Sequence, residues 1–497
     1  MFSQLDNHLD HIVTKVRALQ SKGILPVILL VSVALLLLSG PCLHGDIDLP
    51  WHLVGAKDYL TYGTIRMGDC YSFNATLPLY YNHQWLSSLI FYLFNSLAGD
   101  FGLIVLKLLV GFLTCALIYK AGALRERHTL ASALLLYFCA FQSLYLWTSN
   151  VRARLFAYLL FAAVLYLVER YRIRKSNRAL YGIPLLCALA ANLHAEFVYC
   201  FLPLFALISF PGAAGRGLPI VILGISAAVT LINPWGFDFY TQYLIPAFFR
   251  AGSGRHVADW RMSPYSIYFA FKLCLVLVIS YRVIIYRGKA HSPYESFLFI
   301  VTGVSAVLYD RTSALFYFTL AVWGRSDIEW VGSQLRAVRS DLPLVITRAT
   351  VASLPVLVGL AIFSFVSSPP SLSSPIIWRD WPKGATTWLK ANRAGGDILL
   401  PFNYGSYVLS DLGPRFKVSL DSRYDLIYSD GAVTLALNAL TREGQDARST
   451  LRPDFILLDV VEGSAPHDFL LEEGYVKIFS DTRFVMYERY AEASLRM

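Results

Sequence analysis

The chain has 497 residues, of which 56% are hydrophobic and only 15% are charged, and its mean hydropathy is +0.50. A soluble domain carries about a quarter charged residues, so this composition excludes an ordinary soluble protein and predicts a polytopic membrane protein. The net charge of +9 does not indicate a nucleic-acid partner, because most lysines and arginines lie in short loops between apolar runs, where they set the orientation in the membrane.

The first three quarters of the chain form a series of apolar runs. Residues 1–23 predict an amphipathic helix on the cytoplasmic surface, and the run 24–43 is long enough to cross about 30 Å of hydrocarbon. Ten further runs bring the predicted number of transmembrane helices to about eleven: 101–121, 130–147, 155–168, 180–193, 197–210, 218–232, 266–285, 295–309, 313–323 and 346–366. Several are short for a full crossing, so tilted or paired helices are expected.

Lysines and arginines concentrate in alternate loops, which predicts an N-terminus in the cytoplasm and, after an odd number of crossings, a C-terminus outside. Six arginines run against this trend on the predicted outer side: Arg152, Arg154, Arg250, Arg255, Arg261 and Arg311. Guanidinium groups bind phosphate through planar, bidentate hydrogen bonds, so Arg152, Arg154 and Arg311 are candidates for holding a lipid phosphate. The other three are equally consistent with a solvated loop face.

The first outer loop, residues 44–100, begins GDIDLPWHLV and gathers polar residues at a membrane boundary, where they are costly without a partner or a task. We expect two interfacial helices in it, at 49–62 and 84–97, the second continuing into the next span. The candidate residues of this loop are Asp46, Asp48, His52, Asp69, His83 and Trp85. We interpret the loop as the floor of an active site, in which Asp46 or Asp48 takes the proton of an attacking hydroxyl. Alternatively, Asp48 only caps the helix that follows it.

Two further groups of candidates lie later in the chain. His194 and Glu196, in ANLHAEF, lie at membrane depth or just outside it, where they either serve the site or pair structurally with Arg152 or Arg154. Asp421 and Arg423 follow a predicted strand, at the end where α/β sheets bind ligands. The Asp and His residues of the first loop could bind a divalent cation such as Mg or Mn, although their spacing matches no metal-ligand motif. Alternatively, the histidines donate hydrogen bonds to a phosphate or sugar.

From residue 368 onward the composition becomes that of a soluble domain, entered through a linker rich in proline and serine. Helix-like runs at 381–392, 405–412, 429–440 and 467–474 alternate with strand-like runs at 397–402, 416–421 and 454–459, and strands at 475–480 and 483–489 close the chain. This pattern predicts a small α/β domain at 368–497 outside the membrane, after a transmembrane module at 24–367.

The motifs together resemble the GT-C superfamily of membrane glycosyltransferases, and more narrowly a bacterial GT-C-like group. The resemblance rests on an acidic motif directly after the first span and on short elements in a fixed order: Asp-x-x-Trp-His-Leu from Asp48, Gly-Asp-x-x-Ser around Asp69, His-x-Trp-Leu from His83, Asn-x-His ending at His194, Asn-Pro-x-Gly from Asn233, Asn-Tyr-Gly-x-Tyr from Asn403, and Asp-x-Arg from Asp421. One departure is that the second outer loop, at about 148–154, holds no acidic residue, although many GT-C enzymes have one there.

The resemblance implies an inverting glycosyltransferase of the bacterial inner membrane, which moves a sugar from a polyprenyl-phosphate donor to a lipid, glycan or protein acceptor at the outer face. Asp46 or Asp48 would act as the base, and the C-terminal domain would cover the site. Two alternatives stay open: a lipid or polysaccharide transporter without chemistry, and a scaffold for assembly of the cell envelope. The absence of internal repeats disfavours the transporter.

Overall fold

The structure, a computed structural model, describes residues 24–37, 46–125 (without 66, 67 and 78), 151–246 (without 212–214), 291–324 (without 310 and 311), 358–367, 381–460 and 468–490, with single residues between 11 and 19, 273 and 281, and 326 and 333. The predicted spans at 130–147 and most of 266–285, most of the N-terminal helix and the linker lie outside these residues. The chain divides into two compact units. Unit 1 is Met1–His44, Phe94–Gly236 and Gly254–Ile377, and unit 2 is Gly45–Leu93, Phe237–Ser253 and Trp378–Met497.

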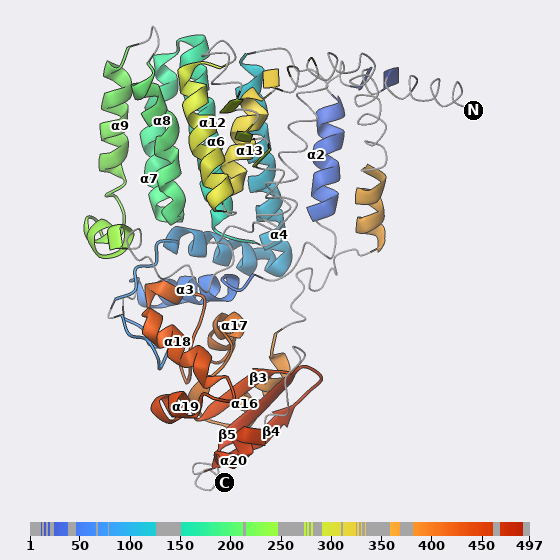
Figure 1. The fold of residues 1–497 in the computed structure, drawn as a ribbon, viewed down its shortest axis with the longest axis vertical. Coiled ribbons are helices and arrows are strands. Elements are labelled where there is room, and N and C mark those ends of the chain that lie inside the picture. Colours follow the sequence, from blue (N-terminus) through green and yellow to red (C-terminus); the bar gives the residue numbers. More distant parts are fainter. Residues whose placement is uncertain are drawn as a thin grey trace. The chain divides into compact units, whose positions relative to one another are not determined.

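Unit 1 is helical throughout its described residues (Figure 1). Its elements are α2 (Ile24–Leu37), the second part of α4 (Trp85–Ala123), α6 (Arg154–Arg174), η3 (Asn177–Gly182), α7 (Ile183–Leu193), η4 (Ala195–Cys200), α8 (Phe201–Ser209), α9 (Gly217–Val229), α12 (Pro293–Leu308) and α13 (Ser313–Trp323). Helix α6 packs on α7, α8 and α13, while α12 packs on α8 and α13. The apolar runs of the sequence that lie among the described residues therefore form helices that pack into a bundle.

The predicted number of about eleven spans is not borne out. Among the described residues, α4 is the one helix long and apolar enough to cross a membrane, and the other apolar helices are shorter. The physical reason is visible in α6, whose apolar stretch between Arg154 and Glu169 is 14 residues, or about 21 Å. The runs 180–193 and 197–210 are likewise divided into 3-10 turns and the short helices α7 and α8.

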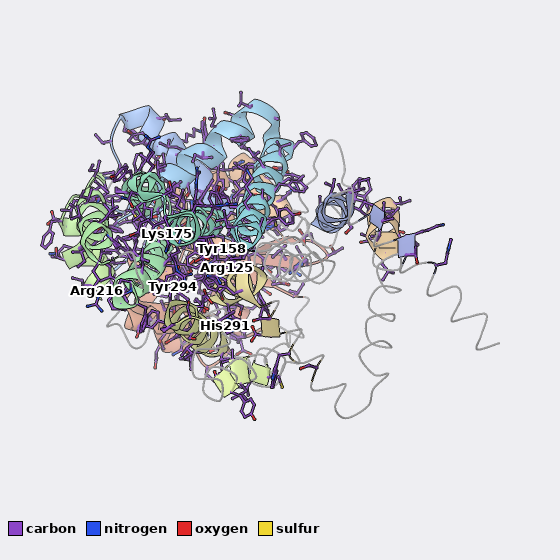
Figure 2. The ribbon with its side chains drawn as sticks, turned by 90° about the horizontal axis from the view of Figure 1, so that it is seen from above. Arg125, Tyr158, Lys175, Arg216, His291 and Tyr294 are labelled. Atoms are coloured by element: carbon purple, nitrogen blue, oxygen red, sulfur yellow. The ribbon has the colours of Figure 1, made fainter. Side chains whose placement is uncertain are left out.

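Buried ion pairs lie near the C-terminal end of α6, and two of the residues that take part in them, Arg125 and His291, are labelled in Figure 2. Glu169, which is fully buried, accepts from Arg125 Nε at 2.9 Å and from Arg172 Nη1 at 2.5 Å. Both arginines also bond Glu295, in the first turn of α12, where Ser292 and Glu295 form a reciprocal capping box. His291 extends the cluster, with Nε2 2.9 Å from Asp327 Oδ2. These groups neutralise one another, as buried charges must.

His291 gives this cluster a pH dependence. Burial disfavours its charged form, but bonds to Asp327 and Glu295 outweigh burial and raise its pKa to about 8. A raised pKa adds stability that is complete below pH 6.5 and is lost as the pH rises through 8. We therefore expect the unfolding free energy to fall by about 2 kcal/mol between pH 6 and pH 9. Thermal melts of the wild type and of His291→Asn measure it, and parallel pH profiles for the two proteins would contradict the expectation.

Unit 2 contains the α/β domain, and all nine of its predicted elements are confirmed. The helices are α16 (Lys383–Asn392), α17 (Phe402–Leu412), α18 (Asp430–Ala439) and α20 (Asp468–Glu472), and the strands are β1 (Gly396–Leu399), β2 (Phe416–Val418), β3 (Phe455–Asp459), β4 (Tyr475–Ser480) and β5 (Phe484–Arg489). A fifth helix, α19 (Gln445–Leu451), is an addition that the sequence did not predict.

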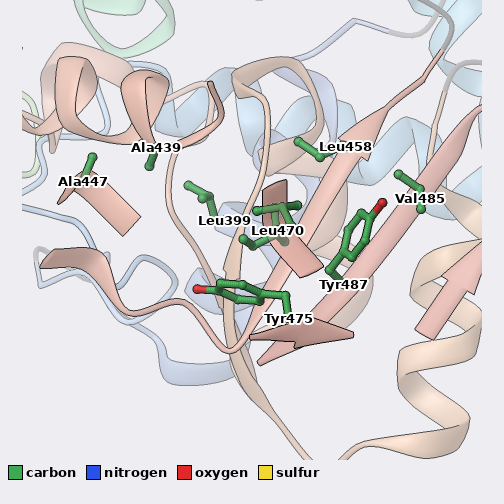
Figure 3. Packing of buried hydrophobic residues seen from close by; sticks show 9 residues of the cluster. Leu399, Ala439, Ala447, Leu458, Leu470, Tyr475, Val485 and Tyr487 are labelled. Carbon is green, nitrogen blue, oxygen red and sulfur yellow. The ribbon is translucent and has the colours of Figure 1, made fainter. Parts of the chain in front are cut away.

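The five strands form one sheet in the order β2-β1-β3-β5-β4. Strands β1, β2 and β3 are parallel, and the hairpin β4–β5 runs antiparallel beside β3. An apolar core lies against α18, α19 and α20 and includes Leu399, Leu458, Leu470 and Val485 (Figure 3). Helix α16 packs on the hairpin strands, and α17 packs on β2 and on α3 (Leu49–Tyr62) of the first outer loop.

The first outer loop is built into this domain. Tyr71 O accepts from Val418 N at 2.9 Å, and Val418 O accepts from Phe73 N at 3.2 Å, so residues 71–73 extend the sheet beside β2. Asn74, which is buried, donates to the carbonyl oxygens of Ser419 and Ala432. The loop and the C-terminal domain, more than 300 residues apart in the sequence, therefore fold as one unit.

Candidate active site

Asp46 and Asp48, the two candidate bases, lie just before the start of helix α3. Asp46 is only 1% exposed, and its Oδ1 accepts from the backbone N–H of Asp48 at 2.9 Å, which forms an Asx turn. Asp48 occupies the N-cap position of α3, as its sequence context predicts, but its side chain makes no capping hydrogen bond. Pro50 in the first turn and Gly63, left-handed with φ 69°, fix the two ends of the helix. The turn-forming role thus falls to Asp46, while Asp48 is partly exposed.

His52 lies one turn into α3 and is buried. Its Nδ1 is 2.8 Å from the hydroxyl oxygen of Ser88 on α4, and its ring meets Phe91 edge-on. Burial lowers the pKa of His52 to about 4, although the nearby Asp46 carboxylate works in the opposite direction. The imidazole is therefore neutral at pH 7, and it ties α3 to α4 rather than supplying positive charge.

The low pKa of His52 predicts sensitivity to acid. The unfolded chain binds a proton at pH 6.5 and the folded chain only near pH 4, so stability from this residue is complete above pH 6.5 and is lost as the pH falls toward 4. We expect about 3 kcal/mol of this loss in the wild type and none of it in His52→Gln. Denaturant unfolding at pH 4.5, 5.5 and 7 measures the difference, and a constant gap between the two proteins would refute it.

Asp69, Asp421 and Arg423, three predicted site residues, meet in one buried network. Arg423 donates from Nε and Nη2 to the two carboxylate oxygens of Asp421, at 2.8 and 2.7 Å, and from Nη1 to Asp69 at 2.5 Å. Tyr428 also donates to Asp421 at 2.8 Å. Burial disfavours the guanidinium charge, but the two carboxylates outweigh it and hold the pKa of Arg423 well above its usual value. Arg423 is thus hydrogen-bonded to both carboxylates, and we call Asp69, Asp421 and Arg423 together the clamp.

Aromatic rings surround the clamp on the side of α3. The guanidinium carbon of Arg423 lies 4.3 Å from the ring centre of Trp51, with Tyr71 and Tyr80 also within cation–π range. Trp51 donates from Nε1 to Tyr80 Oη at 2.7 Å, and Tyr71 donates to Asp58 at 2.6 Å. Burial raises the pKa of Tyr80, and the charge of Asp48 adds to this rise. The clamp thereby holds the first turn of α3, which directly follows Asp48.

His83 and Trp85, the other two candidates of the loop, lie at the start of α4. The His83 ring stacks on Tyr243 with centroids 5.0 Å apart, and its Nε2 is 2.8 Å from Gln84 Nε2. Trp85 contacts Tyr59 with ring centroids 6.0 Å apart. Both residues therefore belong to the packing of unit 2 around α3 and α4.

The candidates of unit 1 are brought together separately. Arg154, the first residue of α6, has its Nε 3.2 Å from Glu196 Oε1. His194 Nδ1 accepts from the backbone N–H of Glu196 and thereby starts the η4 turn. The structural pairing with Arg154 that the sequence left open is thus present. Arg152 is partly exposed two residues earlier, and Arg311 lies outside the described residues.

Sequence reasoning assigned no role to several residues that build the site. Tyr71 and Tyr80 carried no local signal beyond being aromatic, and they bond Asp58 and Trp51 within the first loop. Tyr428, which follows the Asp-x-Arg element in the sequence, bonds Asp421 in the folded C-terminal domain. Within the part of the chain that the structure describes, no three His, Cys, Asp or Glu residues stand close enough to hold a metal ion. The divalent cation considered from the sequence thus has no described ligand set.

Neither a protein-family model nor a curated protein sequence matches the chain. Among solved structures, the chain is similar to the Archaeoglobus fulgidus oligosaccharyltransferase in its apo form, with a TM-score of 0.50 and 12% identity over 93% of this chain and 74% of that one. It is also similar to the same enzyme tethered through a disulfide bond to an acceptor peptide with the NVT sequon, with a TM-score of 0.52 and 13% identity over the same shares. At identities this low, the comparison shows a likeness of fold alone. This likeness supports the GT-C-type fold that the motifs imply.

Proposed function

We propose that the chain is a membrane glycosyltransferase that moves a sugar from a polyprenyl-phosphate donor to an acceptor hydroxyl, with inversion at the anomeric carbon. The acceptor oxygen forms a bond to that carbon while the bond to the donor phosphate breaks. The hydroxyl proton passes to a carboxylate, and polyprenyl phosphate leaves. Asp48 is the proposed base. No step is routed through a metal ion, because the described residues supply no ligand set for one.

The observation that carries the proposal is the position of Asp48 within an oligosaccharyltransferase-like fold. It follows the first apolar helix, it is partly exposed, and its carboxylate does not cap α3. Asp46 beside it is buried and holds the turn, so the two aspartates have different environments. A carboxylate held by a rigid turn and partly shielded from water suits general base catalysis, provided that an acceptor hydroxyl comes within hydrogen-bonding distance.

The charged residues of unit 1 support a placement across the bilayer. Arg154 and Arg172 are 18 residues apart on α6, which is about 27 Å, close to the thickness of the hydrocarbon core. Each end of the helix thus has buried ion pairs, and residues 155–168, between Arg154 and Glu169, are apolar apart from their two tyrosines. In this proposal Arg152, Arg154 and Arg311 hold the donor phosphate at the outer end, where Glu196 and His194 position Arg154.

The placement has two further parts. We propose that the helices of unit 1 lie in the bacterial inner membrane, with the N-terminus inside and residues 368–497 outside. The neighbouring oligosaccharyltransferase structure is tethered to an acceptor peptide. By analogy, the C-terminal domain of this chain, joined to the first loop, takes part in binding a lipid, glycan or protein acceptor.

Sugar transfer by the purified full-length chain tests the function. The protein in detergent is incubated with a radiolabelled polyprenyl-phosphate sugar and an envelope extract as the source of acceptors. Transfer of label from the lipid to a second product, with release of polyprenyl phosphate, is the expected result. A transporter or an assembly scaffold would leave the label on the lipid under all acceptor conditions.

A further inference from the structure

A cleft in unit 2 lies apart from the clamp and has no role in the proposed reaction. It has a volume of about 370 Å³ and is formed by three sets of residues: Pro50, Leu53, Val54 and Lys57 from α3, Tyr92 from α4, and Lys383, Tyr407 and Ser410 from α16 and α17. All three sets belong to the same compact unit, in which α3 and α17 pack together (Figure 1).

The cleft uses one face of α3. Pro50, Leu53, Val54 and Lys57 follow the i, i+3, i+4, i+7 spacing of a single helical stripe. The buried residue His52 belongs to the opposite side of the helix, where it bonds Ser88. The cleft therefore has an apolar floor from one stripe of α3 and lies away from the face that α3 turns to the core.

Its polar rim is positively charged. Lys57 and Lys383 are exposed residues that line the cleft, and no Asp or Glu lines it. Among the described residues, neither ammonium group is within ion-pair distance of a carboxylate. The acidic neighbours have other partners, because Asp58 accepts from Tyr71 and Asp411 is paired with Lys390. Tyr92, Tyr407 and Ser410 add hydroxyl groups to the rim.

We propose that this cleft binds the phosphate headgroup of an anionic phospholipid. Lys57 and Lys383 would bind the phosphate, the hydroxyl groups would bind the glycerol, and the start of the acyl chains would lie on Pro50, Leu53 and Val54. Lysines bury their alkyl stems on apolar surface while their ammonium groups reach a lipid phosphate. The inference rests on the membrane placement proposed above, and it makes α3 a helix anchored at the headgroup level, with Asp48 at its first turn.

Binding of short-chain lipids to the full-length protein tests this assignment. Dihexanoyl phosphatidylglycerol is titrated against the detergent-solubilised chain, and bound lipid is counted by native mass spectrometry. The variant Lys57→Gln with Lys383→Gln is expected to bind about 30-fold more weakly. Lys57→Arg with Lys383→Arg should keep wild-type affinity, and the control Lys477→Gln, which removes an exposed lysine of β4 outside the cleft, should do the same.

Two outcomes would overturn the proposal. One is equal affinity of the wild type and the double glutamine variant for phosphatidylglycerol. The other is binding of glycerol phosphate alone as tight as binding of the lipid, which would make the ligand a free phosphate. Failure of the catalytic proposal is distinguishable, because Asp48→Asn should keep lipid binding whether or not transfer depends on it.

Discussion

Asp48→Asn is expected to reduce sugar transfer by about 10²- to 10⁴-fold, the range that a positioned general base contributes. Asparagine keeps the shape of the side chain and can still begin a helix, but it cannot accept the proton of the acceptor hydroxyl. Since Asp48 makes no capping bond with α3, the variant should fold and melt like the wild type. Initial rates of label transfer, measured with matched amounts of folded protein, give the result.

Asp46→Asn is the matched control for this experiment. Asparagine keeps the Oδ1 atom that accepts from the backbone N–H of residue 48, so the Asx turn should survive. We expect a much smaller loss of transfer than in Asp48→Asn. The reverse ranking would assign the base to Asp46, and full activity in both variants would remove the proposed mechanism altogether.

The sequence predicted local structure well where the signals were local. Helix α3 was predicted at its observed bounds because Asp48 and Pro50 mark its start in the sequence, and in the structure Gly63 ends it. The strands of the C-terminal domain were found because short apolar runs alternate with turn residues. Helix α19 was missed, since its seven residues bury only Ala447 and Arg448 and carry little hydrophobic periodicity.

Roles that depend on distant contacts could not be predicted in the same way. Asp421 and Arg423 gave only a weak signal, and nothing in the sequence linked them to Asp69, 354 residues away from Arg423. Asp46 is buried and forms the turn, whereas Asp48 is partly exposed. This difference depends on the backbone geometry, which the pattern GDID does not determine. Among the described residues, fewer helices than predicted are long enough to cross a membrane, because hydropathy measures apolar length and not helix continuity, as α7, η4 and α8 demonstrate.

Arg423→Met is expected to lower the unfolding free energy by about 3–5 kcal/mol, the largest stability loss that we predict. Methionine fills much of the arginine volume, so the loss comes mainly from Asp69 and Asp421, which would remain buried without their counter-charge. Arg423→Lys should be intermediate, because one ammonium group cannot bond both oxygens of Asp421 and also reach Asp69. Denaturant unfolding of the full-length variants at pH 7 measures the loss.

Two comparisons separate the clamp from an ordinary ion pair. Lys390→Gln breaks a pair whose lysine side chain is 43% exposed, and it should cost at most about 1 kcal/mol. Combining Arg423→Met with Asp69→Asn and Asp421→Asn should recover part of the loss, since the uncompensated charges are then gone.

Because residues 71–73 pair with β2 next to the clamp, hydrogen exchange of that segment should quicken in Arg423→Met and not in Lys390→Gln. If exchange of this segment and the unfolding free energy were both unchanged in Arg423→Met, the clamp would not join the first loop to the C-terminal domain. The clamp could then not be the contact through which the C-terminal domain positions Asp48.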